Sequence, residues 1–285
     1  MHLIDAVVKA TWDAGAAIQD VRARGFDVEQ KGRAGPVTEA DRRADRLLKE
    51  RLLAIRDAAW LSEETADDPS RLEAERVWIV DPLDGTKEFV KGLPEYTVAV
   101  ALVESGVPVL GVVHNPVTGE TFWAERGRGA LFTDPRTANG ELPTTSRAER
   151  AVVREGSTLL ASRSELERGE FDPFRDDWDV TPVGSIEYKL ALVGAGKGSA
   201  TVSRGPKHEW DVCAGVLIVR EAGGIATDLE GNPLRFNQAF PKTRGIMAGA
   251  PEAYARLVRQ VERMGASDRM GELDRGSSTP GSRRP

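Results

Sequence analysis

Five short segments of the chain carry carboxylate, hydroxyl and backbone groups in combinations that could hold metal ions beside a phosphate. They comprise residues 36–41, 61–64, 81–86, 161–164 and 209–211. Hard divalent cations such as Mg²⁺ take oxygen ligands, and two of them close together can stabilise both the attacking and the leaving oxygen of phosphoryl transfer. Because Cys213 is the single cysteine, a multi-cysteine metal site is excluded, and any bound metal should have oxygen ligands.

Each segment has a simpler interpretation when taken alone. Thr38 followed by Asp41 is typical of a helix cap, and Asp211 near a helix start would complement the helix dipole. Glu63 beside Glu64 is typical of a solvated surface pair, and the proline and glycine of residues 81–85 suit a turn. One such segment is weak evidence, whereas five with the right residue types in the right order favour a shared site.

The position of the Asp81 segment at the end of a predicted strand favours a functional role for it. Residues 77–80 read as a short buried strand that stops at Asp81 and Pro82. A strand ending in Asp-x-x-Asp-Gly-Thr places two carboxylates, a backbone carbonyl and a hydroxyl at one rim of a sheet. We therefore expect this rim to cradle a metal and a phosphate.

Several of these residues match a known family: Glu63-Glu64, residues 81–86, Trp210-Asp211, Ala214-Gly215 and residues 221–224. Through them the chain resembles the inositol monophosphatase superfamily, from residue 28 to residue 249. The resemblance implies an α/β (α+β) fold, a layered α-β-α-β-α sandwich of the inositol monophosphatase and sugar phosphatase type. It also implies a Mg²⁺-dependent, lithium-sensitive phosphomonoesterase with two or three Mg²⁺ ions and a metal-activated water.

The resemblance further implies roles for individual residues. The metal ligands would be Glu63, Asp81, the Leu83 carbonyl, Asp84 and Asp211. The catalytic residues that orient and activate the water would be Asp41, Thr86 and Glu63. The residues in contact with the substrate would be Asp84, Gly85, Thr86, Ser185, Arg204 and Asp211.

The substrate is suggested by the string Asp-Pro-Leu-Asp-Gly-Thr-Lys-Glu-Phe at residues 81–89. It most resembles the 3′(2′),5′-bisphosphate nucleotidase branch, which removes the 3′-phosphate of 3′-phosphoadenosine 5′-phosphate. Arg204 would suit a second phosphate, because its planar guanidinium can bind phosphate through two donors. Further positive potential could come from Lys87, Arg163, Lys189 and Lys207. A solvated surface cation is the alternative for each of these residues; it explains Arg204 equally well and is the favoured interpretation of the lysines.

Two kinds of alternative remain open. Within the same class, the substrate could be inositol 1-phosphate or fructose 1,6-bisphosphate. From a different class, the chain could be a non-catalytic, cation-dependent binding protein. That last hypothesis predicts that Asp41 and Thr86 are dispensable, whereas a hydrolase predicts that Asp84→Asn or Thr86→Ala abolishes turnover.

The elements that would position these residues follow from periodicity and turn signals. Helices are expected at residues 1–24, 38–54, 185–195, 210–222 and 251–264, and strands at 159–162 and 199–203. An antiparallel meander is expected over residues 96–132. These elements predict an N-terminal α+β half at 1–145, a C-terminal α/β half at 146–264, and a disordered tail at 265–285.

The amino-acid composition limits the classes of binding partner. A chain of 285 residues with a net charge of −6 lacks the basic excess of a nucleic-acid coat. The sequence has no apolar run long enough to cross a bilayer and no secretory leader at its start, and its single cysteine suits a reducing compartment. We therefore expect a cytoplasmic protein that binds a small phosphorylated substrate, with no nucleic-acid polymer or membrane as partner. The resemblance adds a homodimer as an expectation.

Overall fold

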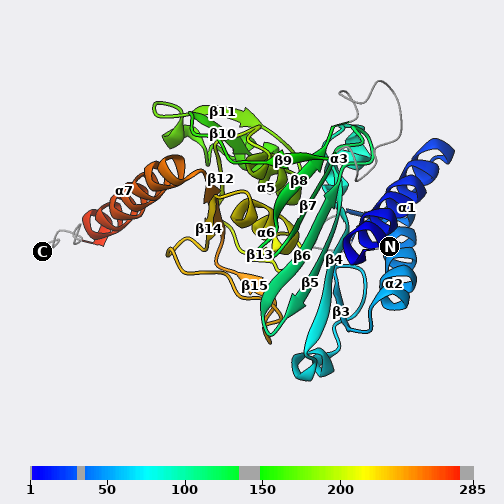
Figure 1. Ribbon diagram of the computed structural model, residues 1–285. Helices are drawn as coiled ribbons and strands as arrows, with labels where there is room; N and C mark the ends of the chain where they lie inside the picture. Colours follow the sequence, from blue (N-terminus) through cyan, green and yellow to red (C-terminus); the bar gives the residue numbers. More distant parts are fainter. Residues whose placement is uncertain (1, 31–35, 135–147, 277–285) are drawn as a thin grey trace, which may run out of the picture.

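Helices and sheets alternate in five layers across the molecule (Figure 1). The computed structural model describes residues 2–30, 36–134 and 148–276. The layers run from a helix pair through a seven-stranded sheet, a second helix pair and a five-stranded sheet to a last helix. The α-β-α-β-α arrangement expected from the sequence is confirmed.

The first layer is α1 (Leu3–Arg24) with α2 (Glu39–Ile55), both close to their predicted bounds. They cover one face of a sheet ordered β3-β4-β5-β6-β7-β8-β9. Its strands are β3 (Ala59–Ser62), β4 (Arg76–Asp84), β5 (Thr97–Glu104), β6 (Val107–His114), β7 (Thr121–Glu125), β8 (Gly129–Thr133) and β9 (Glu149–Ala151). β5 to β8 form the predicted antiparallel meander, whereas β3 and β4 are parallel.

Both faces of this sheet are buried. Along β4, Trp78 and Val80 pack against the α1–α2 layer, while Val77 and Ile79 face the opposite side. This explains why the strand reads as a continuous apolar run rather than an alternating one.

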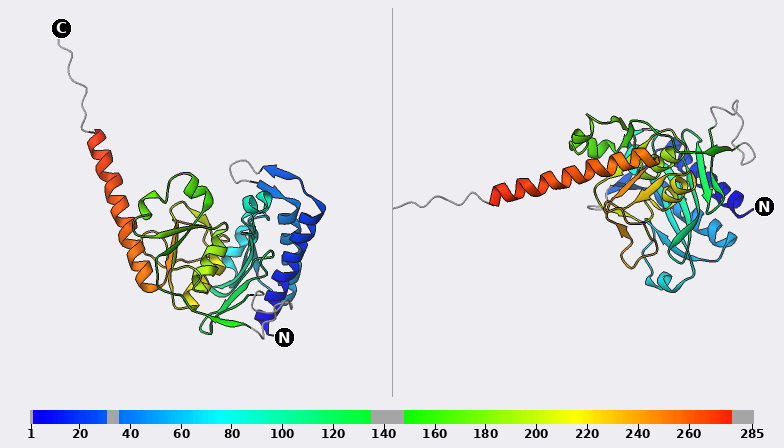
Figure 2. Two further views of the ribbon diagram at one scale, coloured as in Figure 1. Left: turned by 90° about the horizontal axis from the view of Figure 1, so that it is seen from above. Right: turned by 60° about the vertical axis from the view of Figure 1, so that its left-hand side comes forward.

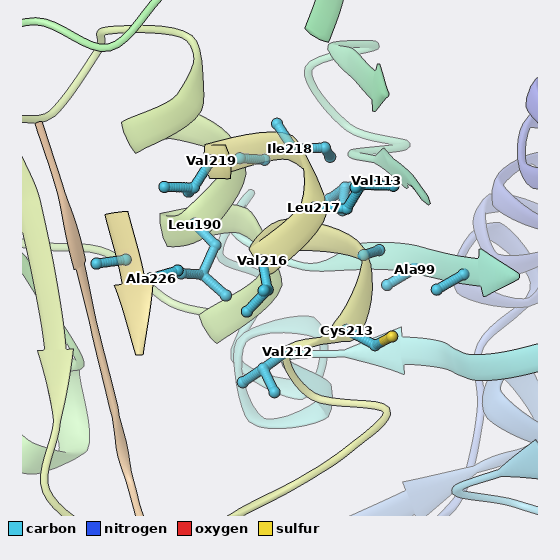
Figure 3. Close-up of a cluster of buried hydrophobic side chains, with 14 of the residues drawn as sticks. Ala99, Val113, Leu190, Val212, Cys213, Val216, Leu217, Ile218, Val219 and Ala226 are labelled. Carbon is cyan, nitrogen blue, oxygen red and sulfur yellow. The ribbon is translucent and has the colours of Figure 1, made fainter. Parts of the chain in front are cut away.

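The middle layer consists of α5 (Ile186–Gly194) and α6 (Cys213–Glu221). Figure 3 shows the apolar side chains of α6, with Leu217 directed toward Val113 of β6 and Val216 close to Leu190 of α5. Cys213 is buried in this cluster, and burial raises the pKa of its thiol well above the ordinary value. The cysteine is therefore a packed side chain, as the sequence suggested.

The second sheet has the order β11-β10-β12-β16-β14. Its strands are β10 (Thr158–Ala161), β11 (Asp179–Pro182), β12 (Ala200–Ser203), β14 (Ile225–Thr227) and β16 (Ile246–Gly249). The last helix, α7 (Pro251–Gly276), packs its first turns against this sheet through Ala253 and Leu257. Its C-terminal part extends beyond the body of the protein (Figure 2). None of the helices in the described ranges is both long and apolar enough to cross a membrane.

Shorter elements complete the chain. They are β1 (Val28–Gln30), β2 (Pro36–Thr38), η2 (Pro69–Glu73), α3 (Thr86–Lys91), α4 (Arg163–Glu167), η5 (Asp172–Phe174), β13 (Lys207–His208) and β15 (Lys242–Thr243).

Several predicted bounds are wrong. β4 does not stop at Asp81 but continues past Pro82 to Asp84, because a register shift against β5 accommodates the proline. α7 continues beyond Met264 to Gly276, where Glu, Leu, Met and Arg are favourable helix residues. β9 pairs with β8, so the first sheet includes residues beyond the predicted boundary at 145. The expected linker at 135–147 and the tail at 277–285 lie outside the described residues.

Gly215 allows α5 and α6 to approach each other closely. A Cβ at this position would lie 2.4 Å from the Leu190 Cβ and 2.6 Å from Oε2 of Glu187. We expect Gly215→Ala to lower the free energy of unfolding by about 1–3 kcal/mol, because neither the helix backbone nor Leu190 can yield without loss of packing. Denaturant unfolding measures this difference.

Gly205→Ala is the matched control, because an added Cβ there meets no atom within 4 Å. Its effect should stay within about 0.5 kcal/mol. Equal stability of the two variants would contradict the close approach of the helices.

Candidate active site

The ends of β3 and β4 place the first acidic residues side by side. The two strands are parallel, with Ser62 opposite Val80, so the residues that follow them lie at the same edge of the sheet. Glu63 directly follows β3, and its backbone N–H donates to the Val80 carbonyl at 3.4 Å. Glu63 and Asp81 are therefore neighbours although 18 positions separate them.

The register shift in β4 brings Asp84 to the same side as Asp81. In a regular strand, residues three apart point to opposite faces. Here the shift falls between Asp81 and Asp84, and both carboxylates line one cavity. Asp81 Oδ1 also accepts a hydrogen bond from the Leu83 backbone N–H at 2.9 Å, which fixes the bend.

The start of α5 holds Asp84 from the other half of the chain. Ser185 lies just before the helix with a φ of 55°, and its hydroxyl donates to Asp84 Oδ2 at 2.5 Å. The backbone N–H of Glu187 donates to the same oxygen at 2.7 Å. The Glu187 side chain in turn accepts the backbone N–H groups of Ala214 and Gly215 at the start of α6. α5 thus links Asp84 to the helix that follows Asp211.

Asp211 lies in the turn before α6 rather than in the helix predicted at 210–222. Its Oδ2 accepts the backbone N–H of His208 at 2.8 Å. The neighbouring Glu209 is buried and accepts the backbone N–H groups of Asn237 and Gln238. These bonds tie the turn to the segment before β15 and direct Asp211 into the cavity.

The cavity has a volume of about 280 Å³ and takes its walls from both halves of the chain. Its lining includes most of the residues predicted to act there: Glu63, Asp81, Leu83, Asp84, Gly85, Thr86, Ser185 and Asp211. Asp41 reaches it through Thr86, whose hydroxyl donates to Asp41 Oδ1 at 3.0 Å. The structure does not place Arg204 on the wall, and its side chain is exposed.

The carboxylates in this cavity repel one another, although Lys189 and Lys207 on the same wall offset part of the repulsion at Asp84. Burial, together with the nearby Glu63, Asp84 and Asp211, raises the pKa of Asp81 well above its ordinary value. Burial and the charge of Asp84 raise the pKa of Asp211 to about 7. Burial also raises the pKa of Asp84, although hydrogen bonds from Ser185 and Glu187 oppose the shift. A cation would relieve this repulsion.

The residues fit a hard divalent cation by chemistry and charge. Asp81, Asp84 and Asp211 each use one carboxylate oxygen for hydrogen bonds within the chain. For the second oxygen of each, the described residues provide no hydrogen-bond donor, and oxygen ligands suit Mg²⁺. In the same ranges, no three acidic, histidine or cysteine side chains already converge tightly enough to hold an ion. The candidate ligands therefore share a cavity without forming a closed cage.

We expect the metal-free protein to lose stability as the pH rises and Mg²⁺ to restore it. Folding raises the pKa of Asp211 from 3.8 to about 7, so between these values the folded state binds more protons than the unfolded state. The free energy of unfolding therefore falls as the pH rises from about 4 to 7. Mg²⁺ binds the charged carboxylates, so it should raise the melting temperature more at pH 8 than at pH 6.

Thermal unfolding with and without Mg²⁺ at both pH values measures the effect. NaCl at matched ionic strength is the control. A stabilisation that is equal at the two pH values, or equal for the two salts, would argue against a cation held by these carboxylates.

Sequence reasoning missed part of the lining. The sequence gives no sign that Glu165 lines the site, and it favours solvated surface cations for Lys189 and Lys207, yet all three lie on the cavity wall. Every residue of α5 is buried, so the sequence of this helix shows no amphipathic pattern from which the burial of Lys189 could be predicted. Only the packing of α5 between two sheets reveals it.

Comparisons with known proteins agree with this geometry. The sequence model of the inositol monophosphatase family matches residues 1–266. An inositol-1-monophosphatase of Rhizobium meliloti is 32% identical over 269 residues, covering 91% of this chain and 95% of the relative. A fructose-1,6-bisphosphatase/inositol-1-monophosphatase of Thermotoga maritima is 34% identical over 250 residues, covering 87% and 93%. The 3′(2′),5′-bisphosphate nucleotidase CysQ of Escherichia coli K12 is 32% identical over 240 residues, covering 82% and 94%.

Solved structures show the same fold. The extragenic suppressor protein suhB of Bartonella henselae superposes with a TM-score of 0.75 at 29% identity, covering 90% of this chain and 96% of that one. CysQ of Bacteroides thetaiotaomicron, described as a bacterial member of the inositol monophosphatase family, superposes with a TM-score of 0.68 at 31% identity, covering 86% and 96%. The family match spans nearly the whole chain, and so this protein belongs to the inositol monophosphatase family.

Proposed function

We propose that this family member is a Mg²⁺-dependent phosphomonoesterase that removes the 3′-phosphate of 3′-phosphoadenosine 5′-phosphate, giving AMP and inorganic phosphate. One observation carries the proposal: Glu63, Asp81, Asp84 and Asp211 line a single cavity with Thr86, which is hydrogen-bonded to Asp41. Membership of a phosphatase family supports the broader part, a hydrolase of phosphate monoesters.

The ligand set and its chemistry follow from the residue types. Glu63, Asp81, the Leu83 carbonyl, Asp84 and Asp211 would hold Mg²⁺, which when bound neutralises phosphate charge and lowers the pKa of a water. Two or three ions are the number we propose. The remaining tasks, which are orienting the water and accepting its proton, belong to the chain itself.

Asp41 and Thr86 are suited to accept that proton. The single hydrogen of the Thr86 hydroxyl has two acceptors in reach, Asp41 Oδ1 at 3.0 Å and the Leu83 carbonyl at 3.2 Å. We assign this hydrogen to the shorter contact, the one to the Asp41 carboxylate. The lone pairs of Thr86 Oγ1 can then accept a hydrogen bond from a water. A proton can then pass through Thr86 Oγ1 to Asp41 Oδ1. Burial raises the pKa of Asp41 and makes it a better proton acceptor than an exposed aspartate.

The nucleotide assignment rests on the 81–89 string, on the likeness to CysQ relatives and on cations in the cavity. Lys207 lines the wall and is partly exposed, so it can receive a second phosphate in place of Arg204. Relatives of similar identity are named for inositol 1-phosphate and fructose 1,6-bisphosphate, so sequence identity alone does not select the substrate.

Phosphate release from the three esters in the presence of Mg²⁺ tests the proposal. We expect kcat/KM for 3′-phosphoadenosine 5′-phosphate to exceed the others by at least about tenfold, because that ratio reports differential binding in the transition state. Preference for inositol 1-phosphate or fructose 1,6-bisphosphate would overturn the nucleotide assignment. Absence of turnover with every ester would favour the non-catalytic binding protein instead.

Three further expectations belong to this proposal. A cytoplasmic location is supported by the single buried cysteine, which suits a reducing compartment. A homodimer and inhibition by lithium are supported by the family resemblance. Sedimentation at several protein concentrations and a lithium titration of phosphate release would test the last two.

A further inference from the structure

Arg71 is a buried arginine that joins two segments far apart in the sequence. It lies in η2, and its side chain is 1% exposed. All three nitrogen atoms of its guanidinium group donate hydrogen bonds. Nε and Nη2 donate to the two carboxylate oxygens of Asp67 at 2.6 and 2.9 Å. Nη1 donates to the side-chain oxygen of Asn237 at 2.6 Å, and Nη2 also donates to the Gln238 carbonyl at 3.0 Å. One side chain therefore connects the loop after β3 with the segment before β15.

On one side, these bonds lead to Asp211. Asn237 donates from its side-chain nitrogen back to the Arg71 carbonyl at 3.0 Å. The backbone N–H groups of Asn237 and of the residue after it donate to the two carboxylate oxygens of Glu209, at 2.6 and 2.9 Å. Glu209 is buried, and its backbone carbonyl accepts the N–H of Cys213 at 3.0 Å. Glu209 thus closes the turn that carries Asp211.

On the other side, the bonds of Arg71 lead to Glu63. The carboxylate that binds Arg71 belongs to the residue four positions after Glu63. At the near end of this loop, Asp45 of α2 accepts from the hydroxyl of Ser62 at 2.5 Å and from that of Thr65 at 2.8 Å. The loop that starts with Glu63 is therefore fixed at its near end to α2 and at its far end to the C-terminal half of the chain.

A buried ion pair of this kind is better suited to fixing a geometry than to adding stability. Taking a guanidinium group out of water is costly, and its attraction to a carboxylate can return little more than that cost. The planar group does impose one arrangement on the partners that it binds. We propose that Arg71 is a positioning residue that holds Glu63 and Asp211 at the separation that a shared cation site requires, so that the two halves of the chain bind Mg²⁺ together.

This inference rests on the proposed function, since it takes Glu63 and Asp211 to be ligands of Mg²⁺. It concerns residues that do not line the cavity, because Arg71, Asn237 and Glu209 are all outside the lining. A change at Arg71 or Asn237 can therefore alter the affinity for Mg²⁺ only by altering the positions of the ligands.

Asn237→Gly is the variant that breaks this connection with the least disturbance of the backbone. Asn237 has a φ of 58°, which glycine adopts freely, and glycine keeps the N–H that donates to Glu209. The change removes the side chain that exchanges hydrogen bonds with Arg71. Calorimetry on the full chain should show an affinity for Mg²⁺ about tenfold below that of the wild type, because groups that orient metal ligands contribute this much. The kcat for phosphate release at saturating Mg²⁺ should stay within about twofold of wild type.

Asn232→Gly is the matched control. Asn232 is exposed on the same connection between β14 and β15, and its side chain donates to Asp228 and Glu230 of that connection. This variant should bind Mg²⁺ as the wild type does.

Arg71→Lys is a second test, because lysine keeps the charge and loses the planar set of donors. It should weaken Mg²⁺ binding at least as much as Asn237→Gly does. Adding Asn237→Gly to Arg71→Lys should weaken binding by less than a further twofold or so, about the limit expected when two residues act through one bond.

Two results would overturn the positioning role. One is a lower melting temperature in Asn237→Gly with an unchanged affinity for Mg²⁺, which would mean that the bond only stabilises the fold. The other is a full, additive loss of affinity when the two changes are combined. If the wild type binds Mg²⁺ but hydrolyses no ester, the proposed function fails, and the calorimetric affinities alone decide the role of Arg71. A wild type that binds no Mg²⁺ would end both proposals.

Discussion

Replacing Asp84 by asparagine should lower kcat/KM for phosphate release by about 10³-fold or more while the protein remains folded. Asp84 Oδ2 accepts from the Ser185 hydroxyl and from the Glu187 backbone N–H. The amide oxygen of asparagine can accept the same two bonds, so the local structure should persist. The amide nitrogen then faces the cavity, where it brings donors and no charge, and such a group cannot serve as a ligand for Mg²⁺.

In this variant, the rate of phosphate release and the affinity for Mg²⁺ measured by calorimetry should both fall. The melting temperature of the metal-free protein should not fall. Asp172→Asn, at an exposed aspartate of η5 outside the cavity, is the control and should match the wild type in all three measurements. Asp84→Asn with more than about a tenth of wild-type activity would mean that Asp84 is not a required ligand.

The parts of the candidate site that could be predicted are those in which the informative residues are close together in the sequence. Thr38 and Asp41 have the spacing of a helix cap, and the structure shows this capping box at the start of α2. The same Asp41 also accepts from Thr86 through its other oxygen, so capping and the proposed catalytic role do not compete. A spacing argument identifies the cap, whereas the second bond joins residues 45 positions apart and appears only once the chain is folded.

The fold was predictable to the same extent. Apolar periodicity gives α1 and α2 to within a few residues, and turn residues separate the strands of the meander. The end of β4 was not predictable, since Pro82 normally terminates a strand and only the pairing with β5 shows that the strand continues. That continuation matters for the site, because the accompanying register shift brings Asp81 and Asp84 to one cavity.

The residues proposed to contact the substrate were the least predictable. Arg204 has the chemistry to bind a phosphate, but it directly follows β12, which ends at Ser203, and the residue is exposed and outside the cavity lining. Lys189 looks like a surface cation, yet α5 lies between two sheets and buries it. Single-residue chemistry cannot distinguish these cases, because burial depends on which elements pack on either side.

Thr86→Ala should lower kcat by about 10²- to 10⁴-fold, the range expected for loss of a positioned proton acceptor, and Thr86→Ser should stay within about tenfold of wild type. The alanine variant removes the hydroxyl between the cavity and Asp41 Oδ1. It leaves Asp41 Oδ2 bonded to the backbone N–H and hydroxyl of Thr38, each at 2.7 Å, so the start of α2 should keep its stability. Asp41→Asn would disturb this cap as well, which makes Thr86 the cleaner position to change.

The two Thr86 variants separate a role in proton transfer from a role in substrate binding. Loss of kcat in the alanine variant, with KM and Mg²⁺ affinity close to wild type and recovery in the serine variant, is the result that proton transfer through Thr86 Oγ1 requires. A raised KM with unchanged kcat would instead mean that Thr86 only helps to bind the phosphate group. Normal kinetics in Thr86→Ala would remove the Asp41–Thr86 pair from the reaction, and the raised pKa of Asp41 would then reflect only its burial beneath the cap.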